Sequence, residues 1–214
     1  MTGSVAARPR ILAVLGNTGS GKSAWIKQTQ LRQAGRLLVW DFSPIDEYAR
    51  FCSYVPMPDL IRRAQHPGAR LAFQAPHNSG VRAELFSVFC RLALHVGNAV
   101  VIVEELKYVT RPSWSPDAWA ALVLTGRKNN LTIIGTSQRP SMVDKDFLGN
   151  ATEIHCGPLG YDADLSTMSR EMRLDKARQA ELAALRPLEF LHYSRETGAL
   201  TRGALKKFSS RART

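Results

Sequence analysis

The stretch "GNTGSGKS", Gly16 to Ser23, decides the expected fold of this chain. It fits the pattern G-x-x-x-x-G-K-[ST], and it lies between an apolar run typical of a strand, residues 10–15, and a helical pattern, residues 21–34. Glycines at these positions let backbone N–H groups turn inward around phosphate oxygens, and the helix adds the partial positive charge of its N-terminus. The stretch therefore predicts a phosphate-binding P-loop between a strand and a helix.

The P-loop motif also assigns roles to its side chains. Lys22 is expected to reach the β- and γ-phosphates of ATP, and the Ser23 hydroxyl is expected to bind Mg²⁺. The expected nucleotide contacts are Gly16, Asn17, Thr18, Gly19, Ser20, Gly21, Lys22, Ser23 and Ala24. A P-loop alone is also compatible with binding without hydrolysis, so hydrolysis requires further residues.

Apolar runs of strand length alternate with helical patterns along the rest of the chain. The expected strands are 10–15, 36–42, 69–75, 99–106, 131–134, 152–158 and 188–194, and the expected helices are 21–34, 81–96, 115–127, 160–172 and 175–185. This alternation predicts an α/β fold with a mostly parallel central sheet flanked by helices. We expect an N-terminal extension at 1–9, a single ATPase domain at 10–201 and a basic C-terminal tail at 202–214.

Two carboxylates, Glu104 and Glu105, end the apolar strand expected at 99–106. Beside a P-loop, Glu104 is expected to hold the Mg²⁺ shell and Glu105 to polarise an attacking water. Aspartate is usual at the first position, and the extra methylene of Glu104 alters the metal geometry. The alternative is an exposed acidic strand end without catalytic function.

The position of the acidic pair in the chain indicates the class of P-loop NTPase. The expected strands 36–42 and 69–75 separate it from the P-loop, so the acidic strand is not the next strand after the P-loop. This insertion, with a glutamate directly after the first acid, favours the additional-strand, catalytic-glutamate class. A small-molecule kinase would ordinarily lack this arrangement and would add an arginine-rich lid.

The stretch "GRKNNLTIIGTSQRPS", Gly126 to Ser141, carries polar residues at both ends of a short apolar strand. If this strand lies between the P-loop strand and the acidic strand, Gln138 emerges at the γ-phosphate and can hydrogen-bond the attacking water or the phosphate. Arg127 lies before the strand, away from its own nucleotide. Two interpretations of Arg127 fit equally: an arginine finger for a neighbouring subunit, and a cation that complements a helix C-terminus.

The charge balance points to a polyanionic partner. Lysine and arginine total 29 against 18 acidic residues, a formal charge of +11, in a chain of 214 residues that is 44% hydrophobic. Such a bias favours nucleic acid, with an anionic membrane surface and a merely solubilising charge as the alternatives. Cys52, Cys90 and Cys156 are widely spaced and are expected to be free thiols of a reducing compartment. The sequence shows no membrane-spanning run and no signal peptide, so a cytoplasmic location is expected.

Four segments together resemble the HerA/FtsK superfamily of DNA-pumping ATPases: "GNTGSGKS", "LLVWDFSPIDEYA", "VVIVEEL" and "GRKNNLTIIGTSQRPS". The resemblance covers roughly residues 10 to 160. Its most specific part is "TSQRPS" with an arginine eleven positions before the glutamine, from Arg127 to Gln138, which matches the family's arginine finger and sensor glutamine. Glu104 departs from the family, which mostly has aspartate there. The compact chain most resembles the genome-packaging ATPases of tectivirus-like viruses with an internal membrane.

The resemblance implies a function and a set of partners. It implies an ATP-hydrolysing translocase that drives double-stranded DNA into a preformed capsid. The expected assembly is a homo-oligomeric, hexameric ring with DNA in its channel, in the host cytoplasm or at a packaging vertex of the virion, where capsid vertex or portal proteins would bind it. The candidate DNA contacts are Arg62, Arg63, Arg70, Lys107, Tyr108 and Arg111. The alternatives are a phage assembly ATPase similar to zonular occludens toxin and a cytosolic small-molecule P-loop kinase.

Overall fold

The computed structural model describes residues 9–31 and 34–206 and contains a nine-stranded sheet in the order β3-β4-β2-β5-β6-β1-β7-β8-β9. The strands are β1 (Ile11–Leu15), β2 (Arg36–Asp41), β3 (Ser53–Tyr54), β4 (Arg70–Gln74), β5 (Ala99–Val103), β6 (Thr132–Ser137), β7 (Glu153–Cys156), β8 (Glu189–Ser194) and β9 (Leu200–Ala204). Neighbours from β3 to β7 pair in parallel, and β8 and β9 add an antiparallel hairpin at the β7 edge.

The order of the central strands confirms the predicted fold class. Strand β6 pairs on one side with β1, which precedes the P-loop, and on the other with β5, which precedes the acidic pair. An additional strand therefore separates the P-loop strand from the acidic strand. Because all three run in parallel, the P-loop, the acidic pair and Gln138 emerge at the same carboxyl edge of the sheet, where ligands bind in open α/β folds.

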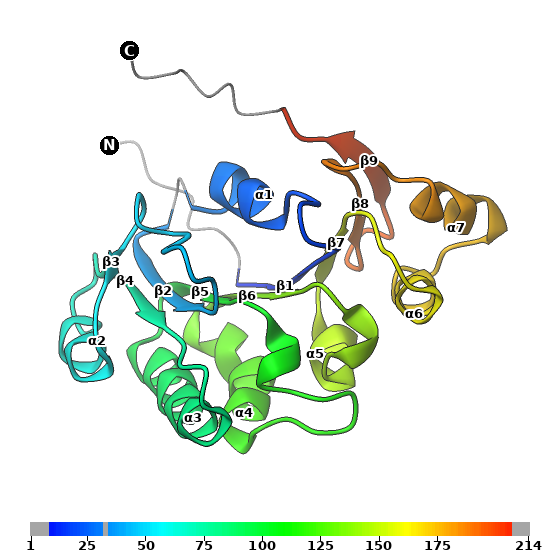
Figure 1. Ribbon diagram of the computed structural model, residues 1–214. Coiled ribbons are helices and arrows are strands. Elements are labelled where there is room, and N and C mark those ends of the chain that lie inside the picture. The colour runs from blue at the N-terminus through cyan, green and yellow to red at the C-terminus, as the bar shows by residue number, and fades with distance from the viewer. Residues whose placement is uncertain (1–8, 32–33, 207–214) are drawn as a thin grey trace, which may run out of the picture.

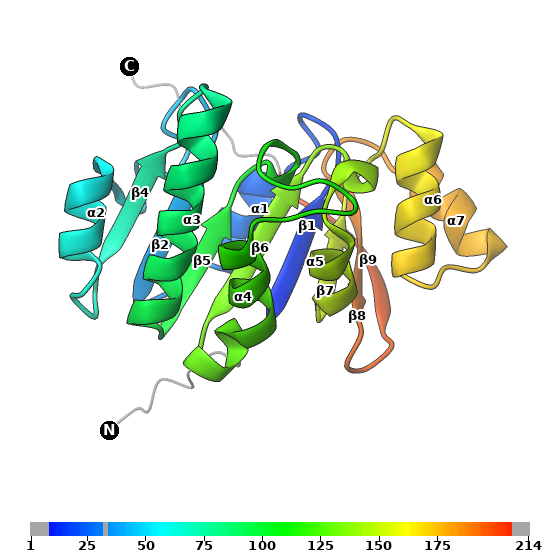
Figure 2. The ribbon, with the colours of Figure 1, turned by 90° about the horizontal axis from the view of Figure 1, so that it is seen from below.

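Helices cover both faces of the sheet, unequally (Figure 1). They are α1 (Lys22–Thr29), α2 (Met57–Arg63), α3 (Ser79–Val96), α4 (Asp117–Thr125), α5 (Lys145–Asn150), α6 (Asp162–Glu171) and α7 (Lys176–Ala183), with short 3-10 turns η1 (Leu106–Tyr108), η2 (Gly126–Asn129) and η3 (Pro140–Met142). Helices α2 to α5 lie side by side across one face, α1 lies on the other, and α6 and α7 flank the β7–β9 end (Figure 2). No helix among the described residues is long and apolar enough to cross a bilayer.

The alternation of side chains along β2 shows how the sheet builds two cores. Leu38 and Trp40 point to the helical layer of α2 to α5, where Trp40 packs against Phe73, Phe86 and Phe89. Leu37 and Val39, which alternate with them, belong to the smaller cluster under α1, with Trp25, Ile26, Leu31 and Tyr48. A sheet that is apolar on both faces is what buried parallel strands require.

Several elements differ from the sequence-based expectations at their ends. The helix expected at 115–127 begins at Asp117, after Pro116, and ends at Thr125. Strand β5 ends at Val103, which leaves both glutamates beyond the strand. Strands β3 and β9 and helices α2 and α5 were not predicted.

Strand β9 also bears on the expected basic tail. It runs to Ala204, past the boundary expected at residue 201, and pairs with β8 along its whole length. Residues 1–8 of the expected N-terminal extension and residues 207–214 of the expected tail lie outside the described part of the chain.

Candidate active site

The P-loop motif, Gly16 to Ser23, runs from the end of β1 into the first turn of α1 and has the backbone that the motif requires. Gly16, Gly19 and Gly21 have φ of 142°, 76° and 98°, values that residues with a Cβ rarely adopt. A Cβ at Gly21 would also lie 2.7 Å from Leu205 Cδ1, and one at Gly16 would lie 2.8 Å from Ser20 Oγ. All three glycines are therefore needed for the backbone conformation, and Gly16 and Gly21 are needed for close packing as well.

Lys22 lies in the first turn of α1, and its side chain contacts the backbone of the P-loop. Its Nζ donates hydrogen bonds to the carbonyl oxygens of Gly16 at 2.7 Å and of Asn17 at 3.1 Å. Burial lowers the pKa of this ammonium, while the nearby carboxylates of Glu105 and Glu104 oppose the change. The loop thus holds a buried cation where the motif predicts phosphate.

Glu104 follows β5 and is buried, with both carboxylate oxygens hydrogen-bonded. Oε1 accepts from the hydroxyl of Tyr48, and Oε2 accepts from the hydroxyl of Thr136. Burial raises the pKa of the Glu104 carboxyl to about 7, against the opposite effect of these two hydrogen bonds. A carboxylate has about four lone-pair sites, so two acceptor sites remain for a metal or its water.

Glu105 and Gln138 meet across the ends of β5 and β6. The backbone N–H of Gln138 lies 3.4 Å from Glu105 Oε2, and the backbone N–H of Glu105 donates to Thr136 Oγ1 at 3.1 Å. Glu105 has φ 54°, in the left-handed region that costs a non-glycine residue about 1–3 kcal/mol. Lys107 Nζ lies 3.7 Å from Glu105 Oε2. Glu105 therefore has a strained backbone, and the surrounding contacts hold its carboxylate beside the P-loop.

One cavity of about 470 Å³ collects these groups. Its lining includes Thr18, Gly19, Lys22 and Ser23 from the P-loop, together with Glu104, Glu105 and Gln138. Phe42, Ser43, Pro44, Glu47, His77 and Tyr108 complete it. The donor set fits both expected cofactors: the glycine cradle and Lys22 suit phosphate, and the hydroxyl and carboxylate oxygens of Ser23 and Glu104 suit Mg²⁺.

Arg127 is not part of this cavity. It is an exposed residue of η2, before the amino end of β6, whereas the cavity lies at the carboxyl end of that strand. The structure therefore brings Glu105, Gln138, Ser23, Glu104 and the P-loop together and leaves Arg127 at the opposite edge of the sheet.

Sequence reasoning missed Thr136 and Tyr48 as site residues. Thr136 bridges the two glutamates, because its hydroxyl donates to Glu104 and accepts from the Glu105 backbone. Tyr48 comes from the segment after β2, within the stretch "LLVWDFSPIDEYA". The Asp41 carboxylate accepts from Ser43 N at 2.8 Å and from the Tyr54 hydroxyl, so it shapes this segment.

The candidate DNA contacts divide into two groups. Arg70 donates to the carbonyl oxygens of Phe51, Ala34 and Leu31, so it is engaged within the fold and is a poor DNA contact. Four of the other candidates are exposed: Arg62 and Arg63 on α2, and Tyr108 and Arg111 in the loop after β5. Lys107 Nζ lies 3.7 Å from Glu105 Oε2 and 5.0 Å from the centroid of the Tyr108 ring, and Tyr108 itself lines the nucleotide cavity.

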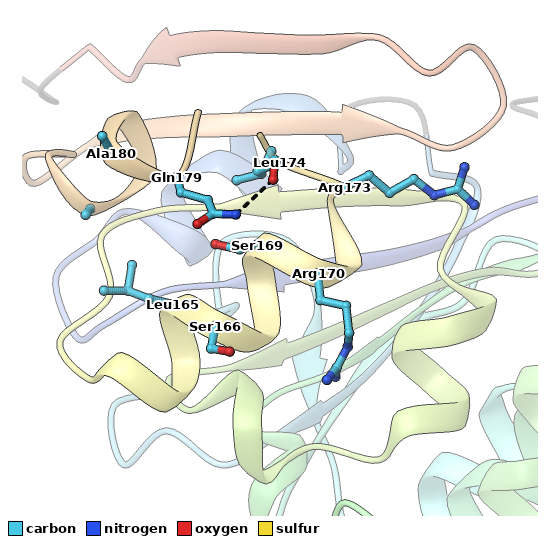
Figure 3. Close-up of a pocket in the computed structure, with 9 residues that line it drawn as sticks. Leu165, Ser166, Ser169, Arg170, Arg173, Leu174, Gln179 and Ala180 are labelled. Carbon is cyan, nitrogen blue, oxygen red and sulfur yellow. Dashed lines mark hydrogen bonds between the residues drawn. The ribbon is translucent and has the colours of Figure 1, made fainter. Parts of the chain in front are cut away.

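A larger cavity, of about 640 Å³, lies between α6 and α7 (Figure 3). Leu165, Ser166 and Ser169 face Gln179 and Ala180 across it, and Gln179 Nε2 donates to Leu174 O at 2.9 Å. The side chains of Arg170 and Arg173 point away from its centre. It contains no P-loop or acidic residue, so the smaller cavity is the candidate active site.

No protein-family model matches the chain. Over 165 residues the chain is 29% identical to Protein P9 of Pseudoalteromonas phage PM2, covering 75% of this chain and 74% of that protein. The genome packaging NTPase B204 of Sulfolobus turreted icosahedral virus 2, in complex with AMPPCP, aligns with a TM-score of 0.76 and 16% identity over 94% of this chain and 100% of B204. VirB4 of Thermoanaerobacter pseudethanolicus aligns with a TM-score of 0.65 and 14% identity over 94% of this chain and 90% of that structure.

These comparisons confirm two expectations. The α/β P-loop fold of the additional-strand class is the fold shared with B204 and VirB4. The expected resemblance to HerA/FtsK-type ATPases is also confirmed at the level of the fold, which this chain shares with a viral genome-packaging NTPase and with VirB4. At 14–16% identity the structural likeness concerns the fold, and the activity of this chain rests on its own site.

Proposed function

We propose that this protein is an ATPase that translocates double-stranded DNA and packages a viral genome into a preformed capsid. The observation that carries the proposal is one cavity lined by Lys22, Glu104, Glu105 and Gln138, in a fold similar to a viral genome-packaging NTPase. The P-loop supports phosphate binding, and the two glutamates support hydrolysis. The net charge of +11 supports a polyanionic partner.

The proposed hydrolysis uses the residues at the carboxyl edge. The P-loop backbone and Lys22 would hold the β- and γ-phosphates, and Ser23 and Glu104 would hold Mg²⁺. Mg²⁺, when bound, neutralises charge on the phosphate oxygens. The Glu105 carboxylate accepts a proton from the attacking water. Gln138, which adjoins the Glu105 carboxylate through its backbone, orients that water or contacts the γ-phosphate.

The proposed assembly is a homo-oligomeric ring, hexameric by analogy with the superfamily. Arg127 acts on the nucleotide of the adjacent subunit, where its charge stabilises the transition state. Exposed basic residues grip DNA phosphates without regard to sequence, as a translocase requires. The ring works in the host cytoplasm or at a packaging vertex of the virion, against capsid vertex or portal proteins.

The test is phosphate release from Mg·ATP with and without double-stranded DNA, alongside the mass of the nucleotide-bound assembly. We expect turnover by the parent protein, stimulation by DNA and a ring-sized mass. Lys22→Ala serves as the control. It should lose turnover, because the positive charge of the lysine beside the phosphates is lost. Phosphate transfer to a small-molecule acceptor, or turnover that DNA leaves unchanged, would contradict the proposal.

A further inference from the structure

The residues directly after Gln138 are anchored on a different part of the fold. Arg139 and Ser141 both bind Asp164, which stands in the first turn of α6. Asp164 is fully buried, and its carboxylate accepts three hydrogen bonds. Arg139 Nε donates to Oδ2 at 2.7 Å, while Ser141 N and Ser141 Oγ donate to Oδ1 at 2.9 and 2.6 Å.

The Arg139 guanidinium has a second contact that fixes its plane. It lies 3.7 Å from the centroid of the Tyr161 ring, the residue before α6. We call Arg139, Ser141, Tyr161 and Asp164 the α6 clamp. A bidentate or stacked arginine is held by geometry as well as by charge, so the clamp restrains the backbone that carries Arg139.

The residue before Gln138 is restrained by different partners. Ser137 pairs with Leu15 at the end of β1, and its carbonyl accepts from the N–H of Gly16, the first P-loop residue, at 3.2 Å. Its Oγ accepts from Arg139 N at 3.1 Å. Gln138 is therefore held between the P-loop on one side and the α6 clamp on the other, while its own N–H faces Glu105.

The clamp is more elaborate than a strand end requires. Burying a charged carboxylate costs free energy that three donors only offset, and a well-packed apolar residue often stabilises a fold equally well. The three convergent hydrogen bonds give defined positions to Arg139 and Ser141, which lie one and three residues after Gln138. The proposed hydrolysis gives no role to Arg139 and Ser141 of "TSQRPS", and the clamp accounts for both residues.

We propose that Asp164 is a positioning residue for ATP hydrolysis, which through Arg139 and Ser141 holds Gln138 in register with Glu105 and the P-loop. This inference rests on the proposed ATPase function. A misplacement of about 1 Å at a reacting centre can reduce the rate about a hundredfold. Loss of the clamp should therefore lower kcat by about ten- to a hundredfold, while KM changes little because the P-loop binds the phosphates.

The test compares Asp164→Asn with Asp162→Asn. Both remove one carboxylate charge from the first turn of α6, but Asp162 is exposed and is outside the clamp. We expect Asp164→Asn to lower kcat with KM nearly unchanged, and Asp162→Asn to match the parent in both. Thermal unfolding of each variant shows whether it folds. Should Asp164→Asn not fold, Ser141→Ala removes one clamp donor and leaves the Arg139–Asp164 pair, and it should lower kcat by a smaller factor.

A second comparison separates positioning from general damage. Asp164→Asn is placed in a Gln138→Ala background, where Asp164 has no glutamine left to position. We expect the double variant to turn over ATP as slowly as Gln138→Ala alone. Equal kcat for Asp164→Asn and the parent, or an undiminished loss in the Gln138→Ala background, overturns the inference. Turnover by the parent in the same assay leaves the proposed ATPase activity intact. No turnover by the parent overturns both.

Discussion

Arg127 and Gln138 lie beyond opposite ends of strand β6. The strand between them, Thr132–Ser137, has six residues, which is about 20 Å of extended chain. Gln138 lines the cavity with Lys22, whereas Arg127 is exposed in η2 at the amino edge of the sheet. An arginine side chain does not span that distance, so the two residues cannot serve the same γ-phosphate within one subunit.

The first prediction follows from that separation. Arg127→Ala should bind ATP normally and lose turnover in the assembled ring by about a thousandfold or more. The variant is then mixed with Lys22→Ala, which keeps Arg127 but has a defective nucleotide pocket. Partial activity should return at interfaces where an intact nucleotide pocket meets an intact Arg127 of the neighbouring subunit. Lys128→Ala, an exposed neighbour in η2, is the control and should keep full activity. Mixed rings without restored activity would show that Arg127 is only a helix-end charge.

The second prediction concerns the proposed base. Glu105→Gln should bind ATP as the parent does and lose turnover, because the amide cannot accept a proton from water. The measurement pairs equilibrium binding of a fluorescent ATP analogue with phosphate release. Glu84→Gln, an exposed change on α3, controls for the loss of one negative charge. Parent-like hydrolysis by Glu105→Gln would remove this residue from the mechanism.

The third prediction concerns the polyanion. Binding to duplex DNA should be insensitive to sequence and should weaken steeply with added salt, because bound basic side chains displace counterions from the phosphates. Titrations of two unrelated duplexes at several salt concentrations measure both properties. A flat salt response, or strong preference for one duplex, would count against a packaging motor.

The fourth prediction concerns the hydroxyl of Tyr48. Tyr48→Phe removes the donor to Glu104 Oε1 in a fully buried position, so it should lower the free energy of unfolding by about 1–3 kcal/mol. Tyr161→Phe removes an exposed hydroxyl and keeps the ring on Arg139, so it should change stability little. Denaturant unfolding of the two variants at neutral pH makes the comparison. Equal stability of both would mean that this hydrogen bond contributes nothing measurable.

The fifth prediction is a pH dependence of stability. The His155 ring stacks on Trp25 at 4.1 Å and lies 4.5 Å from the Phe190 ring, and burial, with a smaller effect of His192, lowers the pKa of His155 well below its ordinary value. Below a pH of about 6.5 the unfolded chain binds a proton that the folded chain does not, so the contribution of this residue to stability is lost as the pH falls.

The measurement for His155 compares the parent with His155→Phe from pH 7 to pH 5. The parent should lose up to about 1.4 kcal/mol per pH unit relative to the variant over this range, since phenylalanine does not titrate. Parallel profiles for the parent and His155→Phe would mean that His155 binds its proton equally in both states.

The parts of the site that sequence predicts are those encoded by local patterns. The P-loop and the acidic strand end carry their geometry in a few consecutive residues, and the "TSQRPS" stretch follows a buried strand directly. Tyr48 could not be found this way, because its partner Glu104 is 56 positions away and only the folded chain brings them together. The same holds for Asp164, which meets Arg139 from a separate helix.

The missed elements are short or weakly patterned. Helix α2 has seven residues and begins with a proline in its first turn, and β3 has two residues. Strand β9 contains Arg202 and Gly203, so its sequence lacks the apolar alternation that marks a strand, and its pairing with β8 supplies the order. Gly203 is required there because a Cβ would lie 2.4 Å from the Phe190 ring.

The place of β1 in the middle of the sheet has a consequence for synthesis of the chain. Ile11 pairs with Ile133 and Leu12 with Glu153, so both neighbours of the first strand emerge from the ribosome long after it. At about 5–20 residues per second, β1 waits on the order of ten seconds for its partners. During that time an apolar strand and an unsupported glycine loop are exposed to aggregation. Nascent chains released before β6 should therefore need chaperone protection and should not retain nucleotide.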